Sequence, residues 1–121
     1  MPETRRVVIV EDDFLVTEYL RQVCEDVGVP VVGNAMDADT ALDLIDELRP
    51  EFVLMDVRLP GARDGVDLAH AVYERHPWIR VIFVTGSNEP LTIRRINADH
   101  PYRILIKPIN PEDLGEALAG D

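Results

Sequence analysis

The sequence predicts an α/β protein with a doubly wound, five-stranded parallel sheet in the order 2-1-3-4-5. Three observations support this fold class. Short apolar or β-branched segments alternate five times with segments whose apolar residues recur every three or four positions, as strands followed by amphipathic helices do. Several apolar segments lack the alternation of half-exposed strands, which is typical of a parallel sheet covered on both faces. The length of 121 residues suits one domain with a real core.

The predicted elements follow one another along the whole chain. In order they are strand 6–10, helix 14–27, strand 29–35, helix 38–48, strand 52–55, helix 66–75, strand 80–85, helix 88–98, strand 104–106 and helix 111–119. At this length, such a sheet usually has its crevice between strands 1 and 3.

In the first half, each helix has a recognisable beginning or end. Helix 14–27 carries an apolar face and is followed by Gly28, a residue typical of helix ends. Asp37 is the expected N-cap of the next helix, and Pro50 ends that helix. The two strands of this half are rich in β-branched residues.

In the second half, an unbroken apolar strand leads to one lone carboxylate. Residues 52–55 are all apolar, and Asp56 follows them directly. The loop 59–65 is dense in turn residues, and Pro77 ends the helix after it. The helix predicted at 88–98 has a weaker apolar pattern than the others.

Composition excludes several classes of protein. The 12 Lys and Arg residues face 23 Asp and Glu residues, giving a net charge of −11. Such a surface repels nucleic acid and acidic lipids, whereas a metal cation is a natural partner. No segment approaches the roughly 20 apolar residues of a membrane span, and Arg5-Arg6 precedes too short an apolar run for a signal peptide. We therefore expect a cytoplasmic protein that binds neither nucleic acid nor membranes.

Five polar residues fall at the carboxyl ends of predicted strands. Glu11 and Asp12 end strand 1, Asp56 ends strand 3, Thr85 ends strand 4 and Lys107 ends strand 5. In this topology all five lie at the ligand-binding edge of the sheet. Three carboxylates would repel one another unless a hard cation such as Mg²⁺ neutralised them. A hydroxyl and an ammonium group on the other side of Asp56 suit a phosphoryl group on that carboxylate.

Each of these residues alone also has an ordinary structural explanation. An aspartate at a strand end commonly starts a turn or caps a helix, a threonine there is often structural, and Lys-Pro is a turn dipeptide. The agreement of four strand ends at one edge favours a site.

In combination, the motifs at these strand ends resemble those of the receiver domains of two-component response regulators. The resemblance extends from Val7 to about Leu118. Its motifs are Val-Ile-Val-Glu-Asp-Asp (8–13), Leu-Met-Asp-Val-Arg-Leu-Pro (54–60), Asp-Gly (64–65), Phe-Val-Thr-Gly (83–86) and Ile-Lys-Pro (106–108). It implies a flavodoxin-like receiver fold, a single receiver domain spanning 1–121, and a signalling role rather than that of an enzyme.

The resemblance also implies roles for individual residues. Asp56 would accept a phosphoryl group from a histidine kinase or histidine phosphotransfer protein, and Thr85 and Lys107 would contact the phosphoryl oxygens. The implied Mg²⁺ ligands are Glu11, Asp12, Asp56 and the main-chain carbonyl of Arg58. Asp13 is expected to cap a helix rather than bind metal, and the Lys107-Pro108 bond is expected to be cis.

The protein would catalyse only its own phosphorylation and dephosphorylation, and would act on an unknown downstream protein as a monomer or weak homodimer. Two rival functions would require different residues at the site. A docking module that has lost phosphorylation would lack one of the site residues, and none is missing. A hydrolase that uses an aspartyl-phosphate usually needs a second aspartate two residues after the nucleophile, where this chain has Arg58.

The chain departs from the family pattern in three places. The loop 60–64 is one residue longer than the common form, and with 121 residues we expect no output domain. The position three residues before Lys107, often aromatic, is Ile104. We predict that Tyr102 shares the face of Ile104 but lies too far from the active edge to replace an aromatic switch.

We therefore predict that the phosphorylation state of Asp56 is transmitted through the segment after Thr85. That segment, residues 86–90, combines Gly, Ser, Asn and Pro and should be loosely held. Its ordering would present a face made of Arg94, Arg95 and Arg103. Less informative residues are expected to be structural: Cys24 as a core residue, and the three histidines, His70, His76 and His100, as surface residues.

Overall fold

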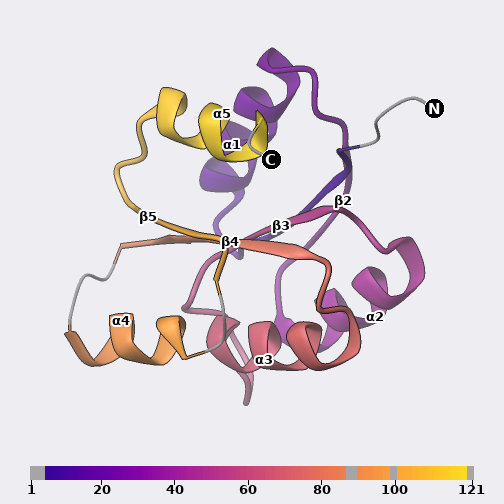
Figure 1. The fold of residues 1–121 in the computed structure, drawn as a ribbon, viewed down its shortest axis with the longest axis vertical. Coiled ribbons are helices and arrows are strands. Elements are labelled where there is room, and N and C mark those ends of the chain that lie inside the picture. Colours follow the sequence, from indigo (N-terminus) through magenta and orange to yellow (C-terminus); the bar gives the residue numbers. More distant parts are fainter. Residues whose placement is uncertain (1–4, 87–89, 99–100, 120–121) are drawn as a thin grey trace.

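The computed structural model describes residues 5–86, 90–98 and 101–119, in which strands and helices alternate five times (Figure 1). The elements are β1 (Val7–Val10), α1 (Phe14–Asp26), β2 (Val31–Ala35), α2 (Ala38–Leu48), β3 (Phe52–Met55), α3 (Gly65–Arg75), β4 (Arg80–Thr85), α4 (Pro90–Asn97), β5 (Arg103–Ile106) and α5 (Pro111–Ala119). All strand pairs are parallel, and the sheet has the order β2-β1-β3-β4-β5. The predicted fold class is confirmed.

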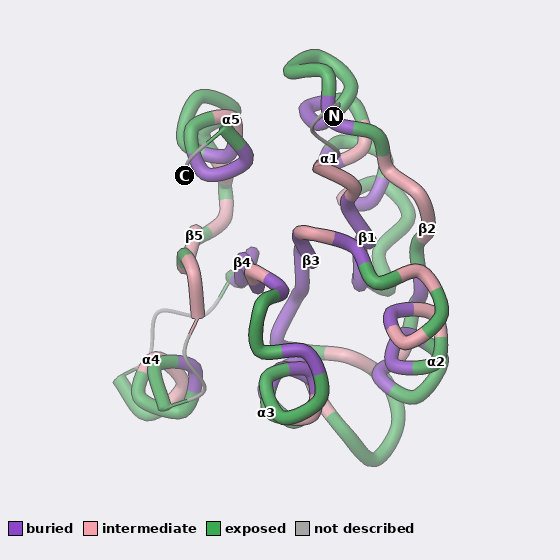
Figure 2. Tube along the Cα trace, turned by 45° about the vertical axis from the view of Figure 1, so that its right-hand side comes forward, coloured by how far each residue is buried: buried purple, intermediate pink, exposed green. Residues whose placement is uncertain are grey.

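The sheet separates two layers of helices and two parts of the hydrophobic core. Helices α1 and α5 cover one face, and α2, α3 and α4 cover the other (Figure 1). Successive residues of a strand point to opposite faces, so Val7 and Ile9 pack beneath α1 and α5 while Val8 and Val10 pack beneath α2 and α3. Figure 2 shows β1 and β3 buried along their lengths, as strands covered on both faces must be. Cys24 is fully buried in the α1 layer, as predicted.

The strand register brings the carboxyl ends of four strands to one edge. Val10 lies opposite Met55, Met55 lies opposite Phe83, and Thr85 lies opposite Ile106. Strand β4 continues two residues beyond Phe83 to Thr85, so Glu11, Asp56, Thr85 and Lys107 all lie at this edge. This register is what assembles the predicted site from distant parts of the chain.

Polar caps set where the helices begin. Asp13 accepts hydrogen bonds from the main-chain N–H groups of Leu15 and Val16, and Asp37 accepts one from Thr40. Both caps were predicted. Helix α3 begins at Gly65, one residue earlier than predicted, because Asp64 caps it in a reciprocal pair of hydrogen bonds with Asp67.

Other predicted boundaries differ by one or two residues or lie outside the described residues. The second strand begins at Val31 rather than Val29, because the N–H group of Val29 instead donates to the carbonyl of Cys24 in the turn after α1. Gly28 adopts a positive φ of 78° in that turn. The predicted beginning of the fourth helix at Asn88 falls outside the described residues; from Pro90 onward the segment is helical as predicted.

Tyr102 does not share the face of Ile104, and the prediction that it does is wrong. Ile104 packs against the core beneath α2, α3 and α4, whereas Tyr102 packs against the core on the opposite face. Its ring contacts Phe52 edge-on, with centroids 6.1 Å apart. Tyr102 precedes β5, so the alternation of a strand does not extend to it.

The prediction that His76 is a surface residue is also wrong. His76 is buried at the end of α3, and its Nε2 lies 2.8 Å from Oδ1 of Asp46 on α2. Arg75 contacts the other oxygen of the same carboxylate. His70 is exposed, as predicted, and His100 lies outside the described residues.

Among the helices of the described residues, none is both long and apolar enough to cross a lipid bilayer. The Lys107-Pro108 peptide bond is cis, as expected.

Candidate functional site

Three carboxylates gather where β1 and β3 end. Glu11, Asp12 and Asp56, which we call the acidic cluster, each offer an oxygen, and these oxygens lie within 4.8 Å of one another. Glu11 and Asp56 are buried, whereas Asp12 is exposed. An all-oxygen donor set with three negative charges suits a hard divalent cation. The residues present therefore fit the predicted Mg²⁺ site.

Glu11 is the most buried carboxylate of the acidic cluster. Its burial is the main reason why its pKa is raised, and the nearby charge of Asp56 raises it further. Two contacts oppose the shift: the N–H group of Asp13 donates to its Oε2 at 3.1 Å, and Lys107 lies beside it. A cation bound beside Glu11 would offset both the cost of burying its charge and the repulsion from Asp56. The position of Glu11 therefore favours cation binding.

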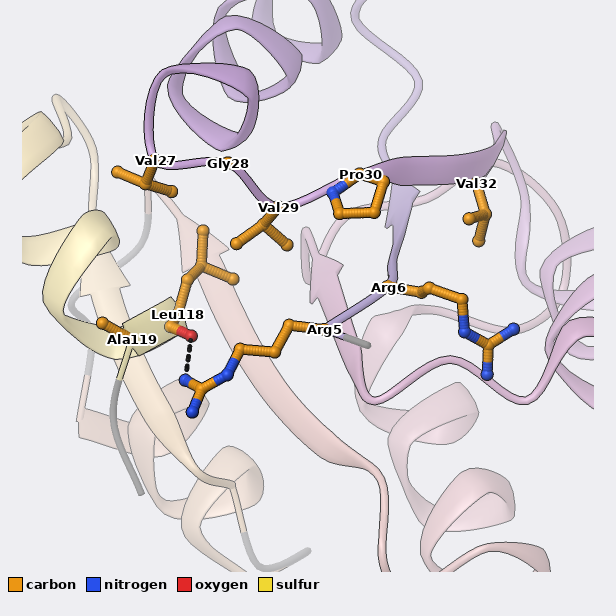
Figure 3. A pocket seen from close by; sticks show the side chains of 9 residues that line it. All are labelled: Arg5, Arg6, Val27, Gly28, Val29, Pro30, Val32, Leu118 and Ala119. Atoms are coloured by element: carbon orange, nitrogen blue, oxygen red, sulfur yellow. Dashed lines mark hydrogen bonds between the residues drawn. The ribbon is translucent and has the colours of Figure 1, made fainter. Parts of the chain in front are cut away.

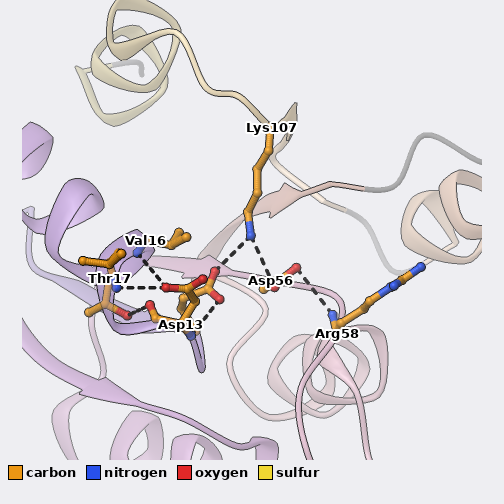
Figure 4. A network of polar contacts seen from close by, with 8 residues as sticks. Asp13, Val16, Thr17, Asp56, Arg58 and Lys107 are labelled. Atoms are coloured by element: carbon orange, nitrogen blue, oxygen red, sulfur yellow. Dashed lines mark hydrogen bonds and ion pairs between the residues drawn. The ribbon is translucent and has the colours of Figure 1, made fainter.

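Lys107 joins the two buried carboxylates of the cluster. Its Nζ lies 3.3 Å from Oε1 of Glu11 and 3.5 Å from Oδ2 of Asp56 (Figure 4). The side chain reaches them from the end of β5, where the main-chain N–H group of Lys107 donates to the carbonyl of Thr85 at 2.8 Å. One ammonium group among three carboxylates leaves the site negatively charged, so it can accept a further cation.

Asp56 is held from behind by main-chain contacts. Its N–H group donates to the carbonyl of Val10 at 3.0 Å, and its Oδ1 accepts the N–H group of Arg58 at 3.4 Å. Gly65, at the beginning of α3, packs so closely that a Cβ atom there would lie 2.0 Å from the carbonyl oxygen of Asp56. About a tenth of the side-chain surface, 11%, remains exposed, so a reagent from solvent can reach the carboxylate.

The structure places the remaining predicted residues at the same edge. Thr85 ends β4 and is almost completely buried, one strand away from Asp56. Arg58 turns its main-chain N–H group to Asp56, while its side chain points away from the acidic cluster (Figure 4). Metal binding by its carbonyl and contact of Thr85 with a phosphoryl group stay predictions.

Two features of the site were not predicted. One is the close approach of Gly65 to Asp56, although the Asp-Gly pair at 64–65 was recognised as a motif. The other is an ion pair between Asp64 and Arg95 on α4, whose Nη1 lies 3.1 Å from Oδ2. The two residues are 31 positions apart, and no local pattern connects them.

A hollow lies at the opposite edge of the sheet (Figure 3). It has a volume of about 540 Å³, and its lining is mostly aliphatic apart from Arg5 and Arg6. Arg5 donates to the carbonyl of Leu118 at 3.0 Å, and Arg6 donates to the carbonyls of Leu48 and Arg49. These arginines tie the chain before β1 to the ends of α5 and α2, which is a structural role. The acidic edge remains the candidate site.

Comparison with known proteins agrees with this arrangement. The response regulator receiver domain family matches residues 7–119. The chain is 38% identical over 115 residues to the positive alginate biosynthesis regulatory protein of Pseudomonas aeruginosa, covering 93% of this chain and 45% of that protein. It is 32% identical over 114 residues to the transcriptional regulatory protein PdtaR of Mycobacterium tuberculosis, covering 94% and 55%. The chain thus spans about half the length of these relatives.

Solved structures of receiver domains have the same fold. The signal receiver domain of a modulated diguanylate cyclase from Desulfovibrio desulfuricans G20 is 31% identical with a TM-score of 0.89, covering 97% of this chain and 92% of that one. A CheY-like response regulator receiver domain protein from Methanospirillum hungatei JF-1 is 26% identical, with the same TM-score and coverage.

The matched residues include every strand of the sheet, the acidic cluster and the lysine that joins its buried members. The chain belongs to the response regulator receiver domain family of two-component signal transduction.

Proposed function

We propose that Asp56 accepts a phosphoryl group from a histidine kinase or histidine phosphotransfer protein, with Mg²⁺ as the required metal. The observation that carries this proposal is the contact of Lys107 with both Glu11 and Asp56 inside an acidic cluster. An ion pair for structural stability needs one carboxylate. Three carboxylates and one ammonium group at a ligand-binding edge fit the transfer of a charged group.

These positions support the following reaction. An oxygen of Asp56 attacks the phosphorus of the donor's phosphohistidine, a P–O bond forms, and the P–N bond breaks to release the imidazole. The N–H group of Arg58 holds the other carboxylate oxygen, which orients the attacking one. Lys107 neutralises charge on the phosphoryl oxygens, and the hydroxyl of Thr85 donates a hydrogen bond to one of them.

The metal would be held by Glu11, Asp12 and Asp56, together with the carbonyl of Arg58. When bound, Mg²⁺ supplies positive charge that stabilises the transferring phosphoryl group. Without it, the acidic cluster repels an incoming phosphate. Dephosphorylation would use the same residues: water attacks the phosphorus, the bond to the Asp56 oxygen breaks, and inorganic phosphate leaves. The domain would thus catalyse only its own phosphorylation and dephosphorylation.

We infer that both partners are proteins and that the domain, residues 1–121, signals by contact in the cytoplasm as a monomer or weak homodimer. The two apolar residues that follow Asp13, Phe14 and Leu15, are 71% and 77% exposed at the beginning of α1. Such an apolar rim beside a charged site suits a protein donor better than a small molecule.

Intact mass after incubation with acetyl phosphate and Mg²⁺ tests the proposal. Wild type should gain the mass of one phosphoryl group, and Asp56→Asn, a matched control of nearly equal size, should gain none. Asp12→Ala should lose metal-dependent phosphorylation, because it removes one ligand without touching the acceptor. Phosphorylation of Asp56→Asn at the wild-type level, or of Asp12→Ala without divalent metal, would refute the site.

A further inference from the structure

Helix α4 is held to the rest of the fold by few side chains. It is eight residues long, and among these residues, all of them described, Ile96 alone is buried. Ile93 packs partly against the same core. Isolated helices shorter than about 12–15 residues are marginal in water, so the position of α4 depends on its contacts with neighbouring elements. Each additional contact between α4 and a neighbouring element should therefore contribute strongly to the position of the helix.

Arg95 provides such a contact by reaching from α4 to Asp64. Its Nη1 and Nη2 donate to Oδ2 and Oδ1 of the aspartate at 3.1 and 3.4 Å, so both guanidinium nitrogens bind one carboxylate. A two-point contact fixes direction as well as distance. Partial burial works against the charge of Asp64, but hydrogen bonds from the N–H group of Asp67 and from Arg95 lower its pKa overall. Asp64 therefore stays ionised at neutral pH.

The other end of this contact lies directly behind the acceptor. Asp64 is the N-cap of α3, and its carboxylate and main-chain N–H group are both bonded to Asp67. The next residue, Gly65, donates to the carbonyl of Val57 at 2.7 Å and packs against the main chain of Asp56. A displacement of the loop after Asp56 must therefore move Asp64, or strain its capping bonds.

We propose that the Arg95–Asp64 pair is a clasp through which the loop after Asp56 fixes the position of α4. Arg95 is thus a positioning residue for signal output. The state-dependent part of this proposal rests on the proposed function, because phosphorylation of Asp56 is what would change the loop. Arg95 is bound to Asp64, and Arg103 lies over the ring of Tyr102 at 4.5 Å. The clasp therefore links the loop to α4 by a different contact from the predicted three-arginine face, which stays a prediction.

Hydrogen exchange of the 121-residue chain, with and without Mg²⁺ and beryllofluoride, tests the clasp. Two variants remove it: Arg95→Gln takes away the guanidinium, and Asp64→Asn removes the charge but keeps a good N-cap. Arg94→Gln is the matched control, because it removes an exposed neighbouring arginine from the same helix. Without any phosphate mimic, both clasp variants should speed exchange in residues 90–97 about two- to fivefold, as loss of a partly exposed ion pair does, and the control should not.

With beryllofluoride, wild type and control should gain protection in both 57–64 and 90–97. The clasp variants should keep the gain in 57–64 and lose most of that in 90–97, and the double variant should lose no more than either single one. The proposal is overturned if both clasp variants keep the full response of α4, if wild-type α4 does not respond, or if the control loses as much. Failure of the proposed function gives a different result, namely no phosphoryl mass and no change at 57–64. In that case the exchange rates of residues 90–97 without beryllofluoride are the only test of the clasp. If these rates in the clasp variants equal those of wild type, the proposal is overturned.

Discussion

Gly65→Ala should lower the free energy of unfolding and slow the phosphorylation of Asp56, because there is no space for a methyl group at this position. The added Cβ would lie 2.0 Å from the carbonyl oxygen of Asp56 and 3.0 Å from Cα of Val57, whereas ordinary contacts begin at 3.4 Å. Main chain must therefore move by about 1.4 Å, the difference between 3.4 and 2.0 Å. Overpacking of this kind costs about 1–3 kcal/mol, and here it should reach the upper end because the neighbours are backbone atoms.

The expected signs are a fall in Tm of roughly 6–12 °C and slower phosphorylation. A misplacement of about 1 Å in a reacting group can cost about 100-fold in rate. Thermal unfolding followed by circular dichroism gives the first value, and the time course of intact mass with acetyl phosphate gives the second.

Gly115→Ala is the matched control for this substitution. A Cβ there would meet only Cγ1 of Val27 at 3.3 Å, and that side chain can shift. Inside α5, alanine is also preferred to glycine by about 1 kcal/mol, so this variant should be neutral or more stable. If Gly65→Ala melts like Gly115→Ala and is phosphorylated at the wild-type rate, the close packing behind Asp56 is not a constraint.

Three further predictions concern other charged residues. Lys107→Ala should still accept some phosphate but lose most of the structural response, because the ammonium group that would bind the phosphoryl oxygens is missing. A full hydrogen-exchange response at wild-type phosphate occupancy would contradict this. Asp46→Asn should lower the free energy of unfolding by about 1 kcal/mol or less at pH 7. The contact with His76 is the main reason why the pKa of Asp46 in the folded protein lies below its usual 3.8. The difference from wild type should therefore shrink as the pH falls from 3.8 through this lowered pKa, where the wild-type carboxylate is protonated. Urea unfolding at pH 7 and in a series of buffers below pH 3.8 would measure it. Arg6→Gln should lower the free energy of unfolding by about 1–3 kcal/mol, because it removes hydrogen bonds to two carbonyls at the end of α2. Urea unfolding at pH 7 measures this loss, and an unchanged free energy would show that those bonds do not stabilise the fold.

The fold and the place of the site could be predicted because both follow from local patterns. The apolar run before Asp56 and the turn residues after it fix a strand end, and parallel topology brings Glu11 and Lys107 to the same edge. The caps at Asp13 and Asp37 were equally local, since each needs only its own side chain and the next few N–H groups. The chemical roles of the site residues stay predictions.

What could not be predicted depends on residues far apart in sequence. His76 looked like a surface residue because its partner, Asp46, is 30 positions away on another helix. Tyr102 was assigned to the wrong face because strand alternation was extended one residue beyond β5, and the contacts that turn its ring come from Phe52 and Arg80. Such contacts are decided by packing, which the period of a pattern does not contain.

The reactivity of Cys24 can report how often helix α1 separates from its face of the sheet. It is the only cysteine of the chain, it is fully buried, and burial raises its pKa to about 12. Because the thiolate is the reactive form, a thiol reagent should modify it only when the α1 layer separates from the sheet. The labelling rate of native protein at increasing reagent concentration therefore measures how often this layer opens and how fast it closes. Labelling before and after phosphorylation would then show whether the side of the sheet away from α4 also changes its opening rate.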